Sequence, residues 1–440
     1  MPHPLLILAA LANTAATPAP DPAELRKTIA ALVGFGTRHT ASDTQSPTRG
    51  IGAARRYAAG RFEAFSKACH GCLTVETVGR TFTGPRAPNG VRVEDVIAIQ
   101  KGSGDPDKVV IVQGHIDSRI SDVMNATGDA PGANDDGSGT ALVIESARLL
   151  SRERFTGTIV YAALSGEEQG LWGGTLLAET AKARGWKVQA VLNNDIVGNT
   201  HGIGGEHVDD VVRVFSEGIV LSAEPTQIKQ QRAIGGEDDS PSRALAKAVQ
   251  ATGDADPVIG LHVFPVRRAD RFGRGGDHTA FLEAGILPAV RITEAVENYD
   301  RQHQDLRTVD ERVYGDTIDF VDFPYLAKVT ALNVAVLRRL ASAPAAPEHV
   351  TIEGALSDDT RISWPSVAGA AGYRIVWRRA DGTPNWTDRK DVGADVNAIT
   401  LTHINIDDHF FGVEALSANG AESIATFGSM PLRPTPGHVK

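Results

Sequence analysis

The sequence predicts an α/β protein with a mixed, mainly parallel central sheet, helices on both faces, and a C-terminal all-β sandwich. Between residues 21 and 340, continuous apolar runs such as VVIVQG at 109–114 alternate with segments of helical period. Such runs fit strands buried on both faces of a sheet. Residues 348–435 instead contain short strand-like pieces separated by turn signals, which is typical of a β-sandwich. The Ala/Pro-rich residues 341–347 are expected to be the linker between the two domains.

Apolar residues at three- and four-residue spacing predict helices, and short apolar or alternating runs predict strands. The expected helices are 24–33, 51–68, 140–150, 171–183, 242–251, 277–284 and most of 310–340. The strands expected in the same part are 91–100, 109–114, 157–164, 190–193 and 287–292. In the C-terminal part the expected strands are 350–353, 360–364, 372–378, 398–401 and 410–416.

Composition excludes several classes of protein. With 440 residues, 42% hydrophobic and 22% charged, the chain has ample apolar surface to bury, so disorder is not its main state. The net charge of −10, without a basic cluster, argues against nucleic acid as a partner. No run of 18 apolar residues follows the N-terminus, so we expect no membrane span.

The first 16 residues resemble a secretory signal peptide. An apolar run at 4–12 is followed by small residues, and Ala10-Leu11-Ala12 fits a cleavage site. This pattern predicts a periplasmic or secreted protein; the alternative is an apolar tail on a cytosolic protein.

The two cysteines, Cys69 and Cys72, form a C-x-x-C motif. Such a motif can be a redox centre, half of a metal site, or a local disulfide. No second pair completes a zinc site, and the following LTVETV alternates like a strand, whereas a redox motif opens a helix. We therefore expect a local disulfide in an oxidising compartment, with two free thiols as the alternative.

Four motifs rich in acidic residues and histidine follow predicted strands. They are His115 with Asp117, Asp135 within GANDDGSG, the pair Glu167 and Glu168, and Asp195. Taken singly, each motif is most simply a surface pair or a capped turn. Together they lie at the carboxyl ends of successive strands, where open α/β sheets place their sites. If strand geometry continues through Glu167 and Glu168, their side chains point in different directions.

These segments, followed by GGDH at 275–278 and YDRQH at 299–303, strongly resemble peptidase family M28. That family of metallopeptidases includes bacterial aminopeptidases, glutamate carboxypeptidases and glutaminyl cyclases. The resemblance covers roughly residues 25–340, and GANDDGSGT and GEEQGLWGG are its most specific parts. It implies the zinc exopeptidase fold, two zinc ions per chain and a peptide substrate.

The resemblance also implies a role for each residue. Asp135 would bridge the two zinc ions, with His115 and Asp195 completing one site and Glu168 and His303 the other. Two further residues would act on the chemistry: Glu167 as the general base for a hydroxide shared by the metals, and Asp117 as the hydrogen-bond partner of His115. The peptide after the bridging aspartate, Asp135–Asp136, is expected to be cis.

One departure from the family pattern concerns the last ligand. The family histidine usually lies in a Tyr-His-Thr context, whereas here the local sequence is Arg-Gln-His303-Gln-Asp. His278, in the Asp-His pair at 277–278, is the competing ligand, although that pair matches a separate family feature. We expect His303 to be the ligand, because imidazole suits zinc and the position matches.

The leading functional interpretation is a di-zinc aminopeptidase. The alternatives are a carboxypeptidase or a glutaminyl cyclase of the same fold, or an inactive scaffold whose sandwich binds a partner. The sandwich resembles a fibronectin type III module through Trp364, Tyr373 and Trp377; we expect it to be available for contact with another protein or a surface. The oligomeric state is not encoded in any pattern found.

The substrate pocket is expected to be built from residues 196–275 and the loop around Phe272. Trp172 is expected either to line the cleft or to pack inside the protein. Arg291 and Glu294, which lie at a predicted strand end, are expected to bind substrate termini or to form a surface ion pair. Because every expected ligand precedes the linker, the peptidase part is expected to fold and act without the sandwich.

Overall fold

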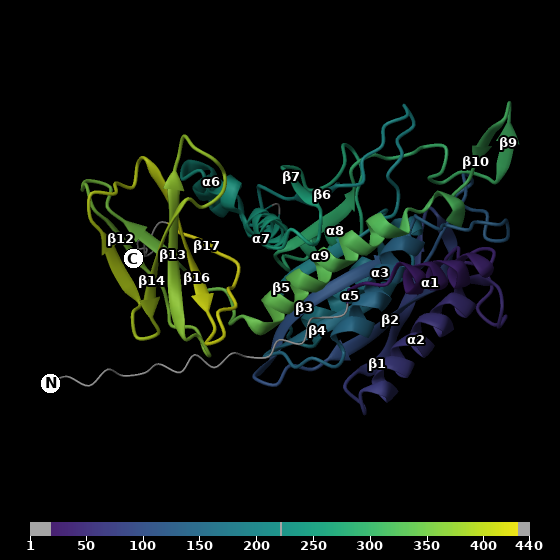
Figure 1. The fold of residues 1–440 in the computed structure, drawn as a ribbon, viewed down its shortest axis with the longest axis horizontal. Coiled ribbons are helices and arrows are strands. Elements are labelled where there is room, and N and C mark those ends of the chain that lie inside the picture. The colour runs from purple at the N-terminus through teal and green to yellow at the C-terminus, as the bar shows by residue number, and fades with distance from the viewer. Residues whose placement is uncertain (1–18, 221, 430–440) are drawn as a thin grey trace, which may run out of the picture.

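A computed structural model describes residues 19–220 and 222–429 of the chain. The predicted signal peptide, residues 1–16, lies outside this range. Two parts lie side by side: an α/β body and a β-sandwich, drawn at the right and the left of Figure 1. The predicted fold class is thereby confirmed.

An eight-stranded mixed sheet forms the centre of the body, in the order β1-β2-β4-β3-β5-β8-β6-β7. The strands are β1 (Thr74–Gly84), β2 (Ala87–Gln100), β3 (Asp105–His115), β4 (Gly157–Leu164), β5 (Lys187–Asn194), β6 (Val211–Ser216), β7 (His262–Val266) and β8 (Ala289–Glu294). The four central strands, β4, β3, β5 and β8, run parallel to one another. Their carboxyl ends therefore meet at one edge of the sheet, and the loops that follow them can share a site.

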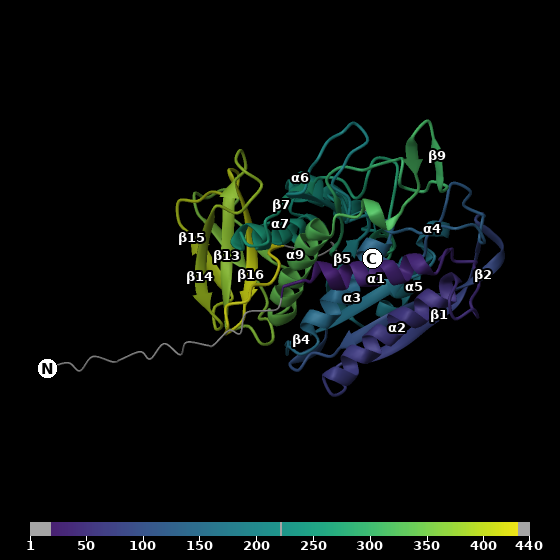
Figure 2. The ribbon, with the colours of Figure 1, turned by 45° about the vertical axis from the view of Figure 1, so that its right-hand side comes forward.

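Helices cover both faces of this sheet (Figure 2). One face packs against α1 (Pro22–Gly34), α2 (Gly50–Ala68), α3 (Gly137–Leu150), α7 (Pro241–Ala255) and α9 (Phe323–Ser342). The other face packs against α5 (Trp172–Ala183) and α8 (His278–Glu283). Alternate side chains of β3 show why the strand is apolar throughout: Val110 and Val112 belong to the first core, and Val109 and Ile111 to the second.

Some elements were not predicted. They are α4 (Glu167–Gly170), α6 (Pro225–Ala233), β6, β7, and the hairpin of β9 (Arg307–Val309) and β10 (Arg312–Tyr314). The prediction of helix over most of 310–340 is wrong for residues 310–322, which form β10 and a 3-10 turn at Ile318–Phe320. The helix begins later because Asp322 caps α9, its side chain accepting a hydrogen bond from the Tyr325 amide.

The C-terminal part consists of two antiparallel sheets. One contains β11 (Thr351–Glu353), β12 (Thr360–Ser363) and β15 (Ala398–Leu401). The other contains β14 (Asp388–Gly393), β13 (Gly372–Arg379), β16 (His409–Leu416) and β17 (Thr426–Phe427). Side chains from both sheets, among them Ile362, Tyr373 and Phe411, form one buried core. Strand β14 was missed because most of its residues are polar, and β17 because it has only two residues.

The segment between the two parts is packed against the body. Helix α9 extends to Ser342, and both Ala341 and Ala343 are fully buried. The buried Lys108 ammonium donates hydrogen bonds to the carbonyls of Leu340, Ala341 and Ala343. The chain therefore enters the sandwich through a segment held by the body.

The sandwich is also joined to the body by a buried ion pair. Arg378 on β13 lies 2.7 Å from Asp239, and the side chains of both are at most 3% exposed. Lys247 on α7 approaches the same carboxylate from the body at 2.5 Å. Two cations from different parts of the molecule thus share one buried anion.

Two smaller predictions concern the rest of the chain. The Cys69–Cys72 disulfide is present at the end of α2, as expected. Among the described residues, no helix is long and apolar enough to cross a membrane.

Candidate metal centre

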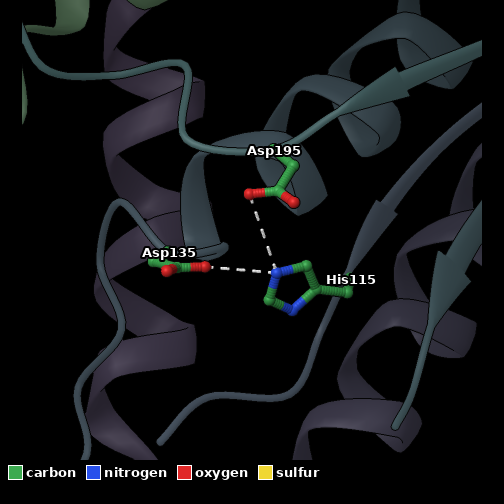
Figure 3. A group of neighbouring side chains, drawn as sticks. All are labelled: His115, Asp135 and Asp195. Carbon is green, nitrogen blue, oxygen red and sulfur yellow. Dashed lines mark ion pairs between the residues drawn. The ribbon is translucent and has the colours of Figure 1, made fainter. Parts of the chain in front are cut away.

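His115 is the last residue of β3, and its side chain is 2% exposed. The strand ends there, two residues before Asp117. The two side chains still meet: His115 Nδ1 lies 3.5 Å from Asp117 Oδ1 and 3.1 Å from the Asp117 carbonyl oxygen. The ring therefore directs Nε2 away from Asp117, towards Asp135 Oδ1 at 3.2 Å and Asp195 Oδ1 at 4.0 Å (Figure 3).

Asp117 is itself held by three donors. Its Oδ2 accepts hydrogen bonds from Thr40 Oγ1 at 2.9 Å and from the Glu168 amide at 3.2 Å. Its Oδ1 accepts one from the Glu167 amide at 3.4 Å. Burial raises the pKa of Asp117, but these bonds and His115 outweigh burial and leave the pKa below its ordinary value. A charged, fixed Asp117 can orient the imidazole and increase its basicity, as carboxylates behind metal-bound histidines do.

Asp135 lies in the loop before α3, and its peptide bond to Asp136 is cis, as the family resemblance implied. The loop is fixed by Asp316, whose carboxylate accepts hydrogen bonds from the amides of Asn134 and Asp135. Asp136 caps α3 by accepting from the Gly139 amide, and its other oxygen accepts from the His115 amide. These bonds hold the side chain of Asp135 over the end of β3.

Asp195 follows β5 and is held by a buried arginine. Arg291 Nη1 lies 2.6 Å from Asp195 Oδ2 and 3.6 Å from Asp270 Oδ2, and its side chain is fully buried. The prediction that Arg291 binds substrate termini or forms a surface ion pair is therefore wrong. Glu294 is also buried, where it accepts hydrogen bonds from Asn134 Nδ2 and the Asn199 amide. Both residues support the loops of the site from within the protein.

Glu167 and Glu168 open the short helix α4, so the expectation of strand geometry through this pair is wrong. Gly166 makes the turn from β4 with φ of 83°, a conformation that favours glycine. Successive side chains in a helix still point about 100° apart. Glu168 is 3% exposed and faces His303, whereas Glu167 lines the cleft.

His303 comes from the loop after β8 and adopts a positive φ of 55°. Its Nε2 lies 2.9 Å from Asp135 Oδ2 and 3.1 Å from Glu168 Oε1. Arg119, which the sequence did not single out, contacts both Glu168 and His303: its Nε is 2.8 Å from Glu168 Oε2 and its Nη2 contacts His303 Nδ1.

His278 lies elsewhere. It is fully buried, and its Nε2 contacts the Ala269 carbonyl at 2.8 Å. The structure thus brings His303, and not His278, to the carboxylates.

Two groups of three side chains have the separation needed to hold a metal ion. They are His115, Asp135 and Asp195, and Asp135, Glu168 and His303; within each group the potential ligand atoms lie within 4.8 Å of one another. Asp135 belongs to both groups. His115 Nε2 and Glu168 Oε1 are buried and lie 3.2 Å from Asp135 Oδ1 and 3.1 Å from His303 Nε2, but neither atom forms a hydrogen bond of normal geometry with a described residue. Buried polar atoms are normally satisfied, so these atoms and the imidazole–carboxylate donor set fit zinc.

The charges of the centre are strongly coupled. Burial lowers the pKa of His303, but Glu168 and Asp135 outweigh burial and raise it to about 10. Burial raises the pKa of Glu167 well above its ordinary value, and nearby carboxylates such as Glu168 add to the effect. Cationic metal ions would relieve this crowding of carboxylates, which is the usual electrostatic reason for such a cluster.

The centre opens into a cleft of about 510 Å³. Besides Asp135, Glu167, Glu168, Asp195 and His303, it is lined by Arg86, Arg119, Gly170, Leu171, Arg271, Gly273, Arg274, Gly275 and Gln302. The loop around Phe272 thus contributes as expected, whereas Arg86, from the β1–β2 turn, was missed. Trp172 does not line the cleft and stacks on Phe82 at 5.4 Å between ring centroids. The described cleft is therefore rich in arginine.

Comparison with known proteins places the chain in a family. The model of peptidase family M28 matches residues 95–321. A probable zinc metalloprotease of Leptosphaeria maculans is 44% identical over 405 residues, covering 91% of this chain and 92% of that protein. Another, from Pyricularia oryzae, is 43% identical and covers 92% and 82%.

Solved structures show the same fold at low identity. A leucine aminopeptidase precursor from Bacteroides thetaiotaomicron matches with a TM-score of 0.51 and 16% identity, over 73% of this chain and 98% of that one. A glutaminyl cyclase from Porphyromonas gingivalis matches with a TM-score of 0.50 and 16% identity, over 72% and 97%. The family match over more than half of the chain, together with relatives similar over nine-tenths of it, shows that the chain belongs to the zinc metalloproteases of peptidase family M28.

Proposed function

We propose that this protein is a di-zinc exopeptidase and, most specifically, an aminopeptidase that releases N-terminal residues from peptides. The observation that carries the proposal is the pair of ligand groups joined by Asp135. His115 and Asp195 would hold one zinc ion, and Glu168 and His303 the other. Two such ions would activate water and polarise the carbonyl of the scissile bond.

The remaining chemistry belongs to the protein. Glu167 lines the cleft next to the ligand Glu168, and Asp117 fixes the Glu167 amide at 3.4 Å. In this position Glu167 takes a proton from the attacking water and passes it to the leaving amine, as a general base and then a general acid. Asp117 and Arg291 are positioning residues, because each holds a ligand and neither lines the cleft.

Two same-fold alternatives make different use of the centre. A glutaminyl cyclase would be expected to use one zinc ion, and a complete second ligand group argues against it. A carboxypeptidase would use the same two ions and requires a free α-carboxylate on its substrate. A scaffold without activity would be expected to have lost a ligand or the base, and all of them are present.

We also propose export to the periplasm or the outside of the cell, and a fibronectin type III-like sandwich. The Cys69–Cys72 disulfide supports export, because such bonds persist in oxidising compartments. Antiparallel sheets of three and four strands around one core support the sandwich assignment.

The decisive test is purification with zinc, followed by metal analysis and turnover of aminoacyl anilides and blocked peptides. Two zinc ions per chain with release of N-terminal residues is the expected result. One zinc ion with cyclisation of N-terminal glutamine, or cleavage only at free C-termini, would contradict the aminopeptidase proposal.

A further inference from the structure

Four guanidinium groups line the same cleft as the metal centre, those of Arg86, Arg119, Arg271 and Arg274. The acidic residues of the described lining are Asp135, Glu167, Glu168 and Asp195, which are all assigned above to the zinc ions or to proton transfer. Two zinc ions would add four positive charges to this balance. The cleft wall beyond the metal centre is therefore cationic wherever the structure describes it.

Arg86 is the least neutralised of the four. It lies in the turn between β1 and β2, and its Nη1 donates a hydrogen bond to the Glu168 carbonyl oxygen at 2.6 Å. It forms no ion pair with any described residue. One bond thus fixes the guanidinium next to a metal ligand, and its other N–H groups have no carboxylate partner.

Arg274 lies in the segment between β7 and α8 and belongs to an unbalanced cluster. The single carboxylate of Glu297 pairs with Arg213 at 2.9 Å, Arg271 at 3.5 Å and Arg274 at 2.9 Å. Arg271 also pairs with Asp270 at 3.1 Å, so Arg213 and Arg274 share the carboxylate of Glu297 and one cation remains in excess. The Arg271 side chain is 8% exposed and that of Arg274 is 34% exposed, so Arg274 is the member that a substrate can reach.

We propose that Arg86 and Arg274 bind a carboxylate of the substrate, so that the cleft selects peptides that carry a negative charge close to the scissile bond. The inference rests on the proposed peptidase function. A guanidinium matches a carboxylate with two parallel N–H donors, and the pairing is strengthened where solvent is reduced and no competing anion is present. Two sources supply the same group: the side chain of Asp or Glu, and the free α-carboxylate of a short peptide.

Two pairs of substrates separate these sources. Glutamyl and glutaminyl anilides differ in a side-chain carboxylate and have no C-terminal one. Leu-Gly and its C-terminal amide differ only in the α-carboxylate. In at least one pair, the charged member is expected to have a kcat/KM about tenfold or more above that of its neutral partner, the usual worth of a charge-assisted pair.

The variants Arg86→Gln and Arg274→Gln are each expected to lose most of this preference, mainly through a higher KM for the charged partner and with a smaller change for the neutral partner. Arg268→Gln is the matched control, since Arg268 lies in the same segment but stacks on Phe272 and does not line the cleft. Zinc content is measured in every variant, because Arg86 contacts the backbone of a ligand. Equal kcat/KM in both pairs, or a preference that persists in both variants, would overturn the inference.

Calorimetric binding of glutarate and its neutral diamide to the zinc-loaded protein adds a measurement without turnover. Glutarate is expected to bind more tightly than the diamide, and the two arginine variants are expected to weaken glutarate alone. Arginine-dependent glutarate binding by a protein that cleaves no peptide would support the inference and refute the peptidase proposal. Rapid cleavage of neutral peptides, with equal binding of glutarate and its diamide, would support the peptidase proposal and overturn the inference.

Discussion

Arg291 and Asp195 form a contact of 2.6 Å in which the guanidinium is fully buried and the carboxylate divides its two oxygens between different tasks. Oδ2 faces Arg291, while Oδ1 lies 4.0 Å from His115 Nε2, on the side of the metal centre. Arg291 also contacts Asp270 at 3.6 Å, so one buried cation stabilises two buried carboxylates. The orientation of Asp195, a candidate zinc ligand, is thereby fixed from inside the sheet.

Replacing Arg291 by Met should weaken both the fold and the metal centre. Removing one partner of a buried ion pair leaves an uncompensated charge and typically costs about 3–5 kcal/mol. Denaturant unfolding should show a loss of this size, and zinc should dissociate more readily because Asp195 loses its fixed orientation. Arg291→Lys is the control that keeps the positive charge. Its stability and zinc affinity should lie between those of the wild-type protein and the Met variant. Unchanged zinc affinity in a folded Met variant would contradict the positioning role.

Glu167→Gln and Glu168→Gln should separate base from ligand. Glu167→Gln should keep both zinc ions and lower kcat by about 10²–10⁴, the usual contribution of a positioned proton-transfer group, with little change in KM. Glu168→Gln should lose affinity for one zinc ion, because an amide is a poorer ligand than a carboxylate, and added zinc should partly restore its activity. Metal analysis decides the matter: loss of zinc from the first variant and retention of both ions by the second would reverse the roles.

The metal-free protein should lose stability as the pH rises. In the folded, metal-free state the pKa of His303 is raised to about 10, whereas an unfolded histidine titrates near ~6.5. The resulting stabilisation is fully present below ~6.5 and is lost as the pH rises through about 10, because only the folded state keeps the proton in that range. Urea unfolding between pH 6 and pH 9.5 should show a steeper decline for wild-type than for His303→Asn protein. Parallel curves would show that His303 is not the group responsible.

Loss of the sandwich should reduce stability without removing the metal ligands. Truncation after Ala341 removes Arg378, which shares the buried Asp239 with Lys247, and it removes one of the carbonyls that accept from Lys108. The truncated protein should still bind two zinc ions and cleave a small anilide, but unfold at a lower temperature. Arg378→Met in the full chain should reproduce part of that decrease. A truncated protein that binds both metal ions but cleaves nothing would assign the sandwich a part in activity.

Mass spectrometry of the protein from its native host should find an N-terminus near residues 13–17, with Cys69 and Cys72 oxidised. The reasons are the small-residue flank of the apolar run and the disulfide in the structure. An intact Met1 together with two titratable thiols would place the protein in a reducing compartment.

Sequence patterns were sufficient for the central layer of the fold, because a strand such as β4, buried along its whole length, must be apolar on both faces. They were insufficient for β7, in which exposed His262 and Phe264 alternate with buried Val263, and for β6, whose short run resembles a loop. They also overextended the final helix, because the residues before Asp322 are held by contacts with distant loops and turns.

The same limit applies to the centre itself. The candidate ligands lie in dense local motifs, whereas Arg119, Asp316 and Arg291 act from positions with no motif around them. Arg119 reaches His303 across 184 positions of the chain. Asp316 reaches the Asp135 amide across 181 positions. Such contacts depend on the folded path of the loops, so a single sequence leaves a lone arginine or aspartate indistinguishable from a surface charge.

The hydrogen bonds of Asp136 have a consequence for how zinc enters and leaves. The Asp136 carboxylate accepts hydrogen bonds from the amides of His115, Gly139 and Ile196. These bonds hold the end of β3, the start of α3 and the residues after β5 in place without a metal ion. The centre is in this sense preorganised, and metal uptake need not bear the entropic cost of ordering three loops. After chelation, the metal-free protein should keep its near-UV circular dichroism, because the loops of the centre stay folded. When zinc is added back, activity should return as fast as the metal diffuses to the centre.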